Sequence, residues 1–596
     1  MIEIQELDTD RLRPSYGSIF LPSSPWKGFQ HFLRIRALRL GHKTALDMAG
    51  TSDELETESR LSYTELYSAS ENLARHLNSM GMCQGSPIAI LAESGPEWGI
   101  AFFGTMLVGA VFIPLDSKAT LAELRTQIED CRPALIFTSS ACRDVAQKLA
   151  FLSGLQTYIM DLESIRQVSR VGVNAPTSPS VLTDKGLSDT ALIVYTSGST
   201  GAAKGVTITV TNLLFQMEKL VEGFNIQEND CFLSILPLNH LLELTCGMLG
   251  VIHGGARTLY CRSLFPADVT HAIRTRKATY MITVPFFLRL MARQIRTGAE
   301  TKSGFRKRLF AFWHRLAPIL PEAVRRRLFQ PVHQALGGRM RGFISGGAPL
   351  DSDTEMFLSR MGIRIYQGYG LTETSPVISA NRPGATRLGS VGKPLPGVEI
   401  RIRPPADAEL KPIGSRRTSE NVHEGEILTR GPHVMSGYYG RQDLTEQVID
   451  KEGWFGTGDV GYINEDGFIY LTGRLKSLIV LEGGKKIHPE EVESTLSCLP
   501  SIKEVCVLMT KVAHGKDELV AVVVPQQDFP TSPTSTHGEV SEMERVLRGE
   551  IETALMALSA YKRPARIVFF NGELPRTASR KIRREAVPSI FGEQEG

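Results

Sequence analysis

The chain has 596 residues, of which 42% are hydrophobic and 22% are charged, and its formal net charge is +3. A chain this long needs more than one hydrophobic core, and this hydrophobic content excludes intrinsic disorder. The small net charge argues against extensive nucleic-acid binding. Eight scattered cysteines without a Cys-x-x-Cys pair indicate a reduced, cytoplasmic protein without a zinc site.

The amino-terminal half alternates helical and strand-like segments. Ser62 and Glu65 form a capping box at the start of a helix, and apolar runs at 87–91, 134–137 and 279–283 predict strands. This alternation predicts parallel α/β sheets covered by helices. Residues 98–115 carry no charge and reach the length of a membrane span, but their glycines favour a buried helix followed by a buried strand.

The segment from Tyr195 to Gly205 reads Tyr-Thr-Ser-Gly-Ser-Thr-Gly-Ala-Ala-Lys-Gly and is rich in groups that bind phosphate. Glycines allow the backbone to approach an anion, and successive amides, hydroxyls and a lysine supply donors. Apolar runs at 191–194 and 206–210 flank the segment, so we expect a loop between two strands. A Walker A loop is excluded because Lys204 precedes Gly205 and no helix follows. The alternative is a Gly/Ser surface linker. The residues expected to bind phosphate are Thr196, Ser197, Gly198, Ser199, Thr200, Gly201 and Lys204.

Residues 302–341 hold ten Lys or Arg and one acid, Glu322. Within them, Phe305, Leu309, Phe312, Trp313 and Leu316 recur at helical spacing. This pattern is typical of a basic amphipathic helix that lies on an anionic membrane surface. A solvated helix face and a basic rim for a phosphorylated ligand are the alternatives.

The sequence pattern changes towards the carboxyl terminus. After about residue 390, short strands separated by Gly and Pro predict a β-rich subdomain. From residue 474 a smaller unit begins, with a charged helix at 489–499 and strands at 505–508 and 519–524. We therefore expect an α/β protein with a large amino-terminal domain of layered sheets over 1–473 and a small α+β domain over 474–596.

Four further segments narrow the chemistry. They are Gln367-Gly-Tyr-Gly-Leu-Thr-Glu373, Gly453-Trp-Phe-Gly-Thr-Gly-Asp459, Gly473-Arg-Leu-Lys-Ser477 and Pro575-Arg-Thr-Ala-Ser-Arg-Lys581. In this order, together with the Gly-rich loop, they resemble the adenylate-forming superfamily of acyl-CoA synthetases, adenylation domains and luciferases. The resemblance covers nearly the whole chain from about residue 40.

The resemblance implies a two-step reaction with ATP, Mg²⁺ and CoA. A carboxylate attacks the α-phosphate of ATP, and the resulting acyl-AMP then reacts with a thiol. It also implies that Lys204 and its loop hold the β- and γ-phosphates, that Glu373 binds Mg²⁺, and that Thr372 donates to the α-phosphate. For the nucleoside, the resemblance implies that Tyr369 stacks on adenine, with Gly370 next to it in the binding segment. It also implies that Asp459 and Arg474 contact the ribose.

The small domain of this superfamily swings between two orientations. By resemblance, Lys476 is the hinge, and Lys581 bridges the carboxylate and the α-phosphate in the first step. The superfamily usually has Gly before this lysine, whereas this chain has Arg580, which takes a positive φ less easily. The backbone around Lys581 is therefore in question.

The sequence indicates the carboxylic acid substrate and the thiol acceptor less clearly than the nucleotide site. The segments 236–243 and 344–350 resemble the acyl-binding segments of long-chain fatty acyl-CoA synthetases, which points to His240, Gly346 and Gly347 as substrate-binding residues. Gly368, in the 367–373 segment, is a further expected substrate-binding residue. Neither segment contains an Asp that could bind the ammonium group of an amino acid or a Lys that could bind a second carboxylate. Glu243 lies in the first segment, so a charged substrate is still an open alternative. We expect a long-chain fatty acid:CoA ligase in the cytoplasm, peripheral to the inner face of a membrane through residues 305–316.

Three alternatives remain open. The first is a fatty acyl-AMP ligase that loads a carrier protein, and the second is a nucleotide-binding relative that has lost catalysis. A luciferase-like oxidation is a minor third, because nothing in the sequence indicates a light-emitting substrate.

Overall fold

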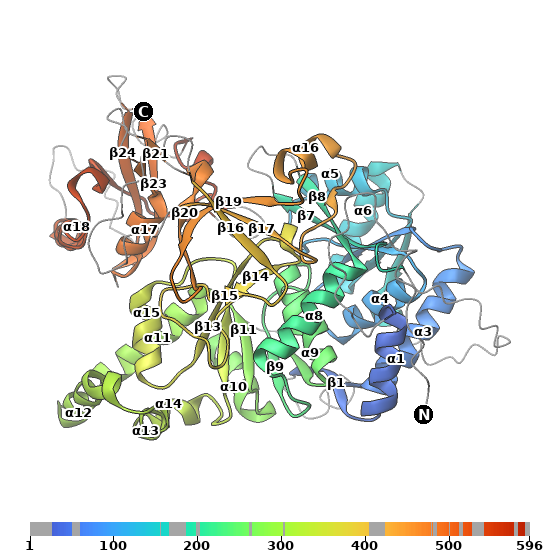
Figure 1. Cartoon of the computed structure of the whole chain (residues 1–596), viewed down its shortest axis with the longest axis horizontal. Coiled ribbons are helices and arrows are strands. Elements are labelled where there is room, and N and C mark those ends of the chain that lie inside the picture. Colours follow the sequence, from blue (N-terminus) through green and yellow to red (C-terminus); the bar gives the residue numbers. More distant parts are fainter. Residues whose placement is uncertain are drawn as a thin grey trace. The chain divides into compact units, whose positions relative to one another are not determined.

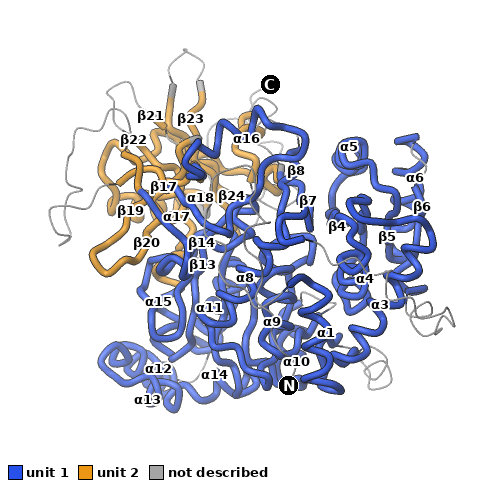
Figure 2. The backbone as a smooth tube through the Cα atoms, turned by 45° about the vertical axis from the view of Figure 1, so that its right-hand side comes forward, with its two compact units in different colours: residues 1–350, 355–401, 428–456 blue, residues 351–354, 402–427, 457–596 orange. Residues whose placement is uncertain are grey.

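A computed structural model gives the fold. It describes residues 27–49, 60–154, 157–165, 186–197, 203–261, 265–301, 304–404, 424–477, 479–480, 486–499, 501–511, 517–526, 542–576 and 582–589. The described chain forms two compact units (Figure 2). Unit 1 comprises residues 1–350, 355–401 and 428–456, and unit 2 comprises residues 351–354, 402–427 and 457–596.

Unit 1 contains two large sheets (Figure 1). The nine-stranded sheet has the spatial order β15 (Lys393–Pro394), β14 (Val377–Ala380), β13 (Ile365–Gly370), β12 (Gly342–Ser345), β11 (Tyr280–Thr283), β9 (Cys231–Ser234), β10 (Arg257–Cys261), β1 (Thr44–Ala49), β2 (Leu61–Ser62). The seven-stranded sheet has the order β18 (Gly437–Tyr438), β8 (Ala203–Thr209), β7 (Thr190–Ser197), β4 (Val111–Pro114), β3 (Pro87–Leu91), β5 (Leu135–Thr138), β6 (Tyr158–Asp161). The six strands from β13 to β1 in the first sheet and the five strands from β7 to β6 in the second are parallel, as the alternating sequence pattern predicts.

Helices connect and cover these strands. They are α1 (Phe29–Leu40), α3 (Tyr63–Ser79), α4 (Pro96–Leu107), α5 (Leu121–Cys131), α6 (Arg143–Ser153), α8 (Val210–Phe224), α9 (Gly250–Gly254), α10 (Pro266–Arg276), α11 (Pro285–Glu300), α12 (Gly304–Leu316), α13 (Glu322–Leu328), α14 (Gln330–Ala335), α15 (Ser352–Arg360) and α16 (Gln442–Val448). The capping box predicted for Ser62 and Glu65 is present at the start of α3.

Helix α4 explains the uncharged run at 98–115. It contacts β1 of one sheet and β4 of the other, so it lies between the two sheets. Because it is buried on every side, all of its faces are apolar. The run then ends in β4, which confirms a buried helix followed by a strand. None of the described helices combines the length and the apolar character needed to cross a bilayer.

Unit 2 is built around smaller sheets. A four-stranded sheet contains β16 (Glu399–Arg403), β17 (Gly425–Arg430), β19 (Phe455–Ile463) and β20 (Ile469–Arg474), and its β19 and β20 are antiparallel. The unit boundaries fall within its first three strands. The carboxyl-terminal part has the pair β21 (Ile479–Val480) and β22 (Lys486–Ile487), the sheet of β23 (Ile502–Lys511), β24 (Asp517–Pro525) and β25 (Arg566–Phe569), and the helices α17 (Pro489–Ser497) and α18 (Glu542–Leu555). The predicted helix and strands of the small α+β unit are therefore present. The domain boundary at residue 474 stays a proposal.

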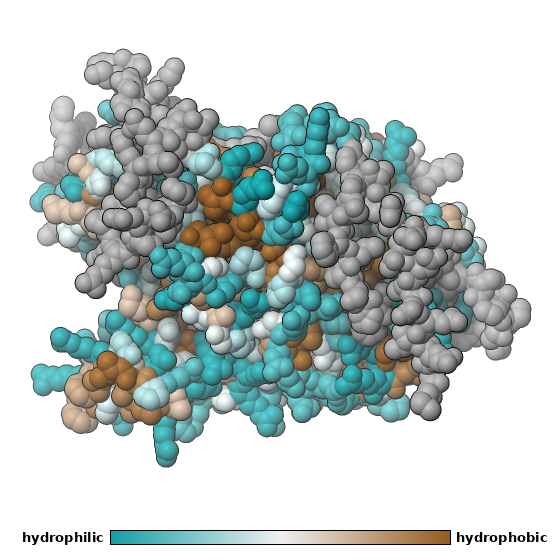
Figure 3. Space-filling view, in the orientation of Figure 1, coloured by the Kyte–Doolittle hydropathy of each residue, from teal (hydrophilic) through white to brown (hydrophobic). Residues whose placement is uncertain are grey.

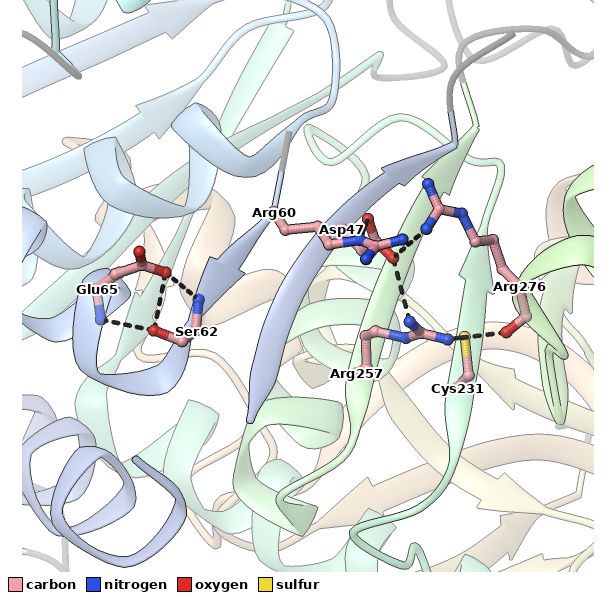
Figure 4. A network of polar contacts seen from close by, with 7 residues as sticks. All are labelled: Asp47, Arg60, Ser62, Glu65, Cys231, Arg257 and Arg276. Carbon is pink, nitrogen blue, oxygen red and sulfur yellow. Dashed lines mark hydrogen bonds and ion pairs between the residues drawn. The ribbon is translucent and has the colours of Figure 1, made fainter. Parts of the chain in front are cut away.

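A buried ion network lies near the β2 edge of the nine-stranded sheet, around β1 and β10 (Figure 4). Asp47 on β1 is fully buried and lies 3.2 Å from Arg60 Nε, 3.2 Å from Arg257 Nη1 and 3.7 Å from Arg276 Nη1. Arg257 also donates to the backbone oxygen of Arg276 at 2.8 Å. Burial raises the pKa of Asp47, and the positive charges of Arg257 and Arg60 partly oppose this. The network joins β1, β10 and the end of α10.

Removing the carboxylate should destabilise the protein strongly. Asp47→Ala would remove a fully buried carboxylate that lies beside three guanidinium groups, and breaking a buried ion pair in this way costs about 3–5 kcal/mol. The free energy of unfolding in urea should show this loss. Asp144→Ala on the exposed side of α6 serves as the control and should change it by less than about 0.5 kcal/mol. Equal stability of the two variants would contradict the role of the network.

Candidate active site

The Gly-rich loop connects the antiparallel strands β7 and β8. Ser197 pairs with Ala203, and Thr196 pairs with Lys204, which places Lys204 at the base of a hairpin. The tip of the hairpin lies outside the described residues; it includes Gly198, Ser199, Thr200 and Gly201. The predicted loop between two strands is thus present, and both flanking strands belong to the seven-stranded sheet, which argues against the surface-linker alternative.

Tyr438 connects this hairpin to the predicted magnesium ligand. Its strand β18 pairs with β8, so that Tyr438 lies opposite Val206. Lys204 Nζ is 5.3 Å from the centroid of the Tyr438 ring. The Tyr438 hydroxyl donates a hydrogen bond to Glu373 Oε1 at 3.0 Å. Sequence reasoning missed Tyr438, whose only signal is its place in the Gly-Tyr-Tyr-Gly run ending at residue 440.

Glu373 is well placed to bind a divalent cation. It lies with Thr372 on a 3₁₀ turn that follows β13, and Met435 N donates to its backbone oxygen at 2.8 Å. Burial and the Glu373 charge raise the pKa of Tyr438, so the phenol stays a donor and orients the carboxylate. In the described part of the chain, Glu373 Oε2 has no hydrogen-bond partner, and no cluster of three or more metal-ligating side chains occurs. This donor set fits Mg²⁺, which binds one or two carboxylates together with substrate phosphates.

The segment predicted to contact adenine forms the end of β13. Tyr369 is buried opposite Ser379 of β14, and Gly368 lies opposite Ala380. A Cβ atom at Gly370 would lie 1.7 Å from the Pro376 backbone oxygen, so packing alone requires glycine there. The roles of these residues in nucleotide binding stay predictions.

The two segments predicted to bind the acyl group leave the same edge of the nine-stranded sheet. The His240 segment follows β9, and the Gly346 segment follows β12, with β11 between them. A Cβ atom at Gly346 would lie 3.0 Å from Leu242 Cδ2, so the segments are in contact. Gly347 has φ +83°, a conformation that favours glycine. Ligands of parallel sheets bind at the carboxyl ends of the strands, which agrees with this placement.

Glu243 lies at the start of a π-helix, Glu243–Leu249, directly after the His240 segment. Its side chain is fully buried, and neither carboxylate oxygen makes a hydrogen bond within the described chain. Burial raises its pKa to about 8, and the nearby Ser234 hydroxyl and Leu236 amide oppose this only partly. Glu243 is therefore mostly a neutral acid at pH 7.

The Glu243 carboxyl should make stability fall as the pH rises. Its unfolded pKa is 4.5 and its folded pKa is about 8, so between these values the folded state holds a proton that the unfolded state has lost. The wild-type free energy of unfolding should then decrease by up to about 1.4 kcal/mol per pH unit in this window. Glu243→Gln removes this dependence, so its stability relative to wild type should increase from pH 5 to pH 8.

Urea unfolding at the two pH values measures the difference, which should be on the order of several kcal/mol. Glu465→Gln, at an exposed turn of unit 2, is the control. A Glu243→Gln variant whose stability relative to wild type is the same at both pH values would contradict a raised pKa.

Unit 2 brings together the two residues predicted to contact ribose. Asp459 on β19 lies opposite Arg474 at the end of β20, and Arg474 Nε is 2.7 Å from Asp459 Oδ1. Asp459 is buried, whereas half of the Arg474 side chain is exposed. The pairing holds both side chains at one end of the four-stranded sheet.

The residues that flank the predicted catalytic lysine pair with each other, and Arg584 beyond them contacts the neighbour of the predicted hinge residue. Lys581 lies outside the described residues, but Arg576 and Ile582 on either side of it form a β-bridge. Arg584 then donates to Ser477 Oγ at 3.1 Å, next to the predicted hinge residue Lys476. Arg584 also donates to Glu493 Oε1 on α17 at 2.7 Å. No local pattern in the sequence pairs Arg584 with Ser477, so this contact could not be predicted.

Comparison with known proteins identifies the family of the chain. The sequence profile of the family described as "AMP-binding enzyme" matches residues 33–439, and that of the "AMP-binding enzyme C-terminal domain" matches residues 491–581. An indoleacetate–CoA ligase of Aromatoleum aromaticum is 30% identical over 89% of this chain and 94% of its own length. A long-chain-fatty-acid–CoA ligase of Mycobacterium bovis is 28% identical over 72% of each chain.

A solved structure shows the same architecture. The o-succinylbenzoate coenzyme A synthetase of Bacillus subtilis, in complex with ATP and a magnesium ion, is 25% identical. It matches over 94% of this chain and 99% of its own chain, with a TM-score of 0.69.

Proposed function

Because the chain belongs to the AMP-binding enzyme family, we propose that it is a long-chain fatty acid:CoA ligase that forms an acyl-AMP intermediate. Acid:CoA ligation through an adenylate is the class of activity that the family and its CoA-ligase relatives support. ATP, Mg²⁺ and CoA are the corresponding cofactor and co-substrates. The observation that carries the proposal is that Tyr438 contacts both predicted phosphate-side residues. Its ring lies beside Lys204 Nζ, and its hydroxyl donates a hydrogen bond to Glu373.

The chain's own residues account for the first step. Bringing a carboxylate to a triphosphate concentrates negative charge, so positive groups and oriented donors lower the barrier. We assign Lys204 and the hairpin amides to the β- and γ-phosphates, and Thr372 to the α-phosphate. Glu373 holds Mg²⁺, which neutralises charge that develops on the phosphates. Lys581 bridges the carboxylate and the α-phosphate, and Asp459 with Arg474 holds the ribose.

The environment of Glu243 supports an uncharged acyl chain. An ammonium group of an amino acid would need a fixed negative charge near the acyl segments, and Glu243 is the acid within these segments. Its carboxyl is fully buried and burial raises its pKa to about 8, which favours an uncharged acyl group beside it. The long-chain-fatty-acid–CoA ligase among the relatives also supports a fatty acid as the substrate. The indoleacetate–CoA ligase among them makes aryl acids the main alternative class of substrate.

A substrate panel tests this proposal. The panel runs from butyrate to stearate and includes indoleacetate and 2-succinylbenzoate, with pyrophosphate release and CoA thioester measured for each acid. Burying one more methylene contributes up to about 0.8 kcal/mol, so kcat/KM should rise about two- to fourfold per methylene until the site is filled. A higher kcat/KM for an aryl acid than for every fatty acid would overturn the long-chain assignment.

The same panel separates the alternative functions. Pyrophosphate release without CoA thioester, followed by transfer to a carrier protein, would show a fatty acyl-AMP ligase. No pyrophosphate release with any acid would show a nucleotide-binding relative without catalysis. The proposal includes a cytoplasmic location peripheral to the inner face of a membrane, because long-chain acids partition into bilayers.

A further inference from the structure

Helix α12 presents an apolar face to solvent. Phe305, Leu309 and Phe312 are 76%, 41% and 57% exposed. Their spacing of four and three residues places them on one side of the helix. Figure 3 shows hydrophobic residues gathered at the lower left, where Figure 1 labels α12. Contiguous exposed apolar groups of this size usually mark an interaction surface.

The opposite side of α12 is the side that anchors it to unit 1. Phe310 and Trp313 pack against the hydrophobic cluster that includes Phe329 and Phe357. His314 Nε2 lies 3.2 Å from the Phe357 backbone oxygen. Because α12 already packs against unit 1 through another side, the exposed apolar residues are not needed for packing in the core.

Cations surround this apolar face. Arg306, Lys307, Arg308 and Arg315 are exposed, and none of them forms an ion pair with a described acid. The single acid of the 304–341 stretch, Glu322, pairs with Arg364 at 2.8 Å instead. Glu300, at the end of α11, is the exposed acid next to α12 in sequence. The surface is thus both apolar and strongly positive.

We propose that α12 binds the surface of a bilayer that contains anionic phospholipids. Phe305, Leu309 and Phe312 would enter the boundary between headgroups and acyl chains, and the flanking cations would contact lipid phosphates. A basic rim for a soluble phosphorylated ligand explains the cations but not three exposed apolar side chains on the same helix. A purely solvated face explains neither the apolar residues nor the absence of acids.

Vesicle flotation tests the proposal with the full chain. Wild type should float with vesicles of equal parts phosphatidylglycerol and phosphatidylcholine and not with phosphatidylcholine alone. Phe305→Ser combined with Phe312→Ser should lower the bound fraction at least about 10-fold. Phe151→Ser removes a phenylalanine that is 85% exposed on α6, and it should bind like wild type.

Three outcomes would overturn the proposal. The first is wild type that does not float with the anionic vesicles, and the second is a double variant that binds them like wild type. The third is lipid-free self-association that the double variant abolishes, because it would assign the face to a second copy of the chain. Pyrophosphate release with a short, water-soluble acid should be unchanged in the double variant, which shows that it is folded and separates this test from that of the ligase activity.

Discussion

Replacing Lys581 with alanine should lower the rate of acyl-AMP formation by about 10²–10³-fold, the typical effect of removing one charged donor from a transition state. The same variant should make thioester from supplied acyl-AMP and CoA at nearly the wild-type rate. The reason is that the ammonium group stabilises charge on the carboxylate and the α-phosphate only while these are reacting. Pyrophosphate release and thioester formation, measured separately, give the two rates.

The control for Lys581→Ala is Arg583→Ala, which removes an exposed cation two residues further along. It should leave both half-reactions within about threefold of wild type, since a solvent-exposed charge is screened. Equal loss of both half-reactions in Lys581→Ala would contradict a small domain that works in two orientations. Arg580→Gly, which restores the usual glycine, addresses the backbone at this point: a faster first step would show that Arg580 limits it.

The sequence predicted the strands of the large unit well because their signals are local. Buried parallel strands such as β3 and β11 are apolar runs of their own, and the capping box at Ser62 lies within four residues. The same holds for the Gly-rich hairpin, whose flanking runs define both strands. Local signals of this kind do not depend on the rest of the chain.

Contacts between distant segments could not be predicted in this way. Tyr438 meets Glu373 and Lys204 only because β18 pairs with β8, and a two-residue strand has no recognisable pattern. Asp47 lies within an apolar strand, and its partners come from three other segments. Motif resemblance identified Glu373 and Lys204 separately, but only the pairing of β18 with β8 shows that Tyr438 lies between them.

Replacing Glu373 with glutamine should lower kcat/KM for MgATP by at least about 10²-fold, because the amide oxygen is a weaker ligand for a hard cation than a carboxylate. Glutamine still accepts the hydrogen bond from the Tyr438 hydroxyl, so the local structure should survive. The concentration of Mg²⁺ needed for half-maximal pyrophosphate release should increase at the same time. Titration of Mg²⁺ at fixed ATP provides the measurement.

Tyr438→Phe is the matched variant for Glu373→Gln. It keeps the carboxylate and removes only the 3.0 Å hydrogen bond that orients it. Loss of such an orienting partner typically costs 10–100-fold, so Tyr438→Phe should be impaired about 10-fold. The double variant should then be little worse than Glu373→Gln alone, because the phenol acts through the carboxylate. Fully additive losses would show instead that Tyr438 has a separate role, and its ring beside Lys204 Nζ would be the place to look for it.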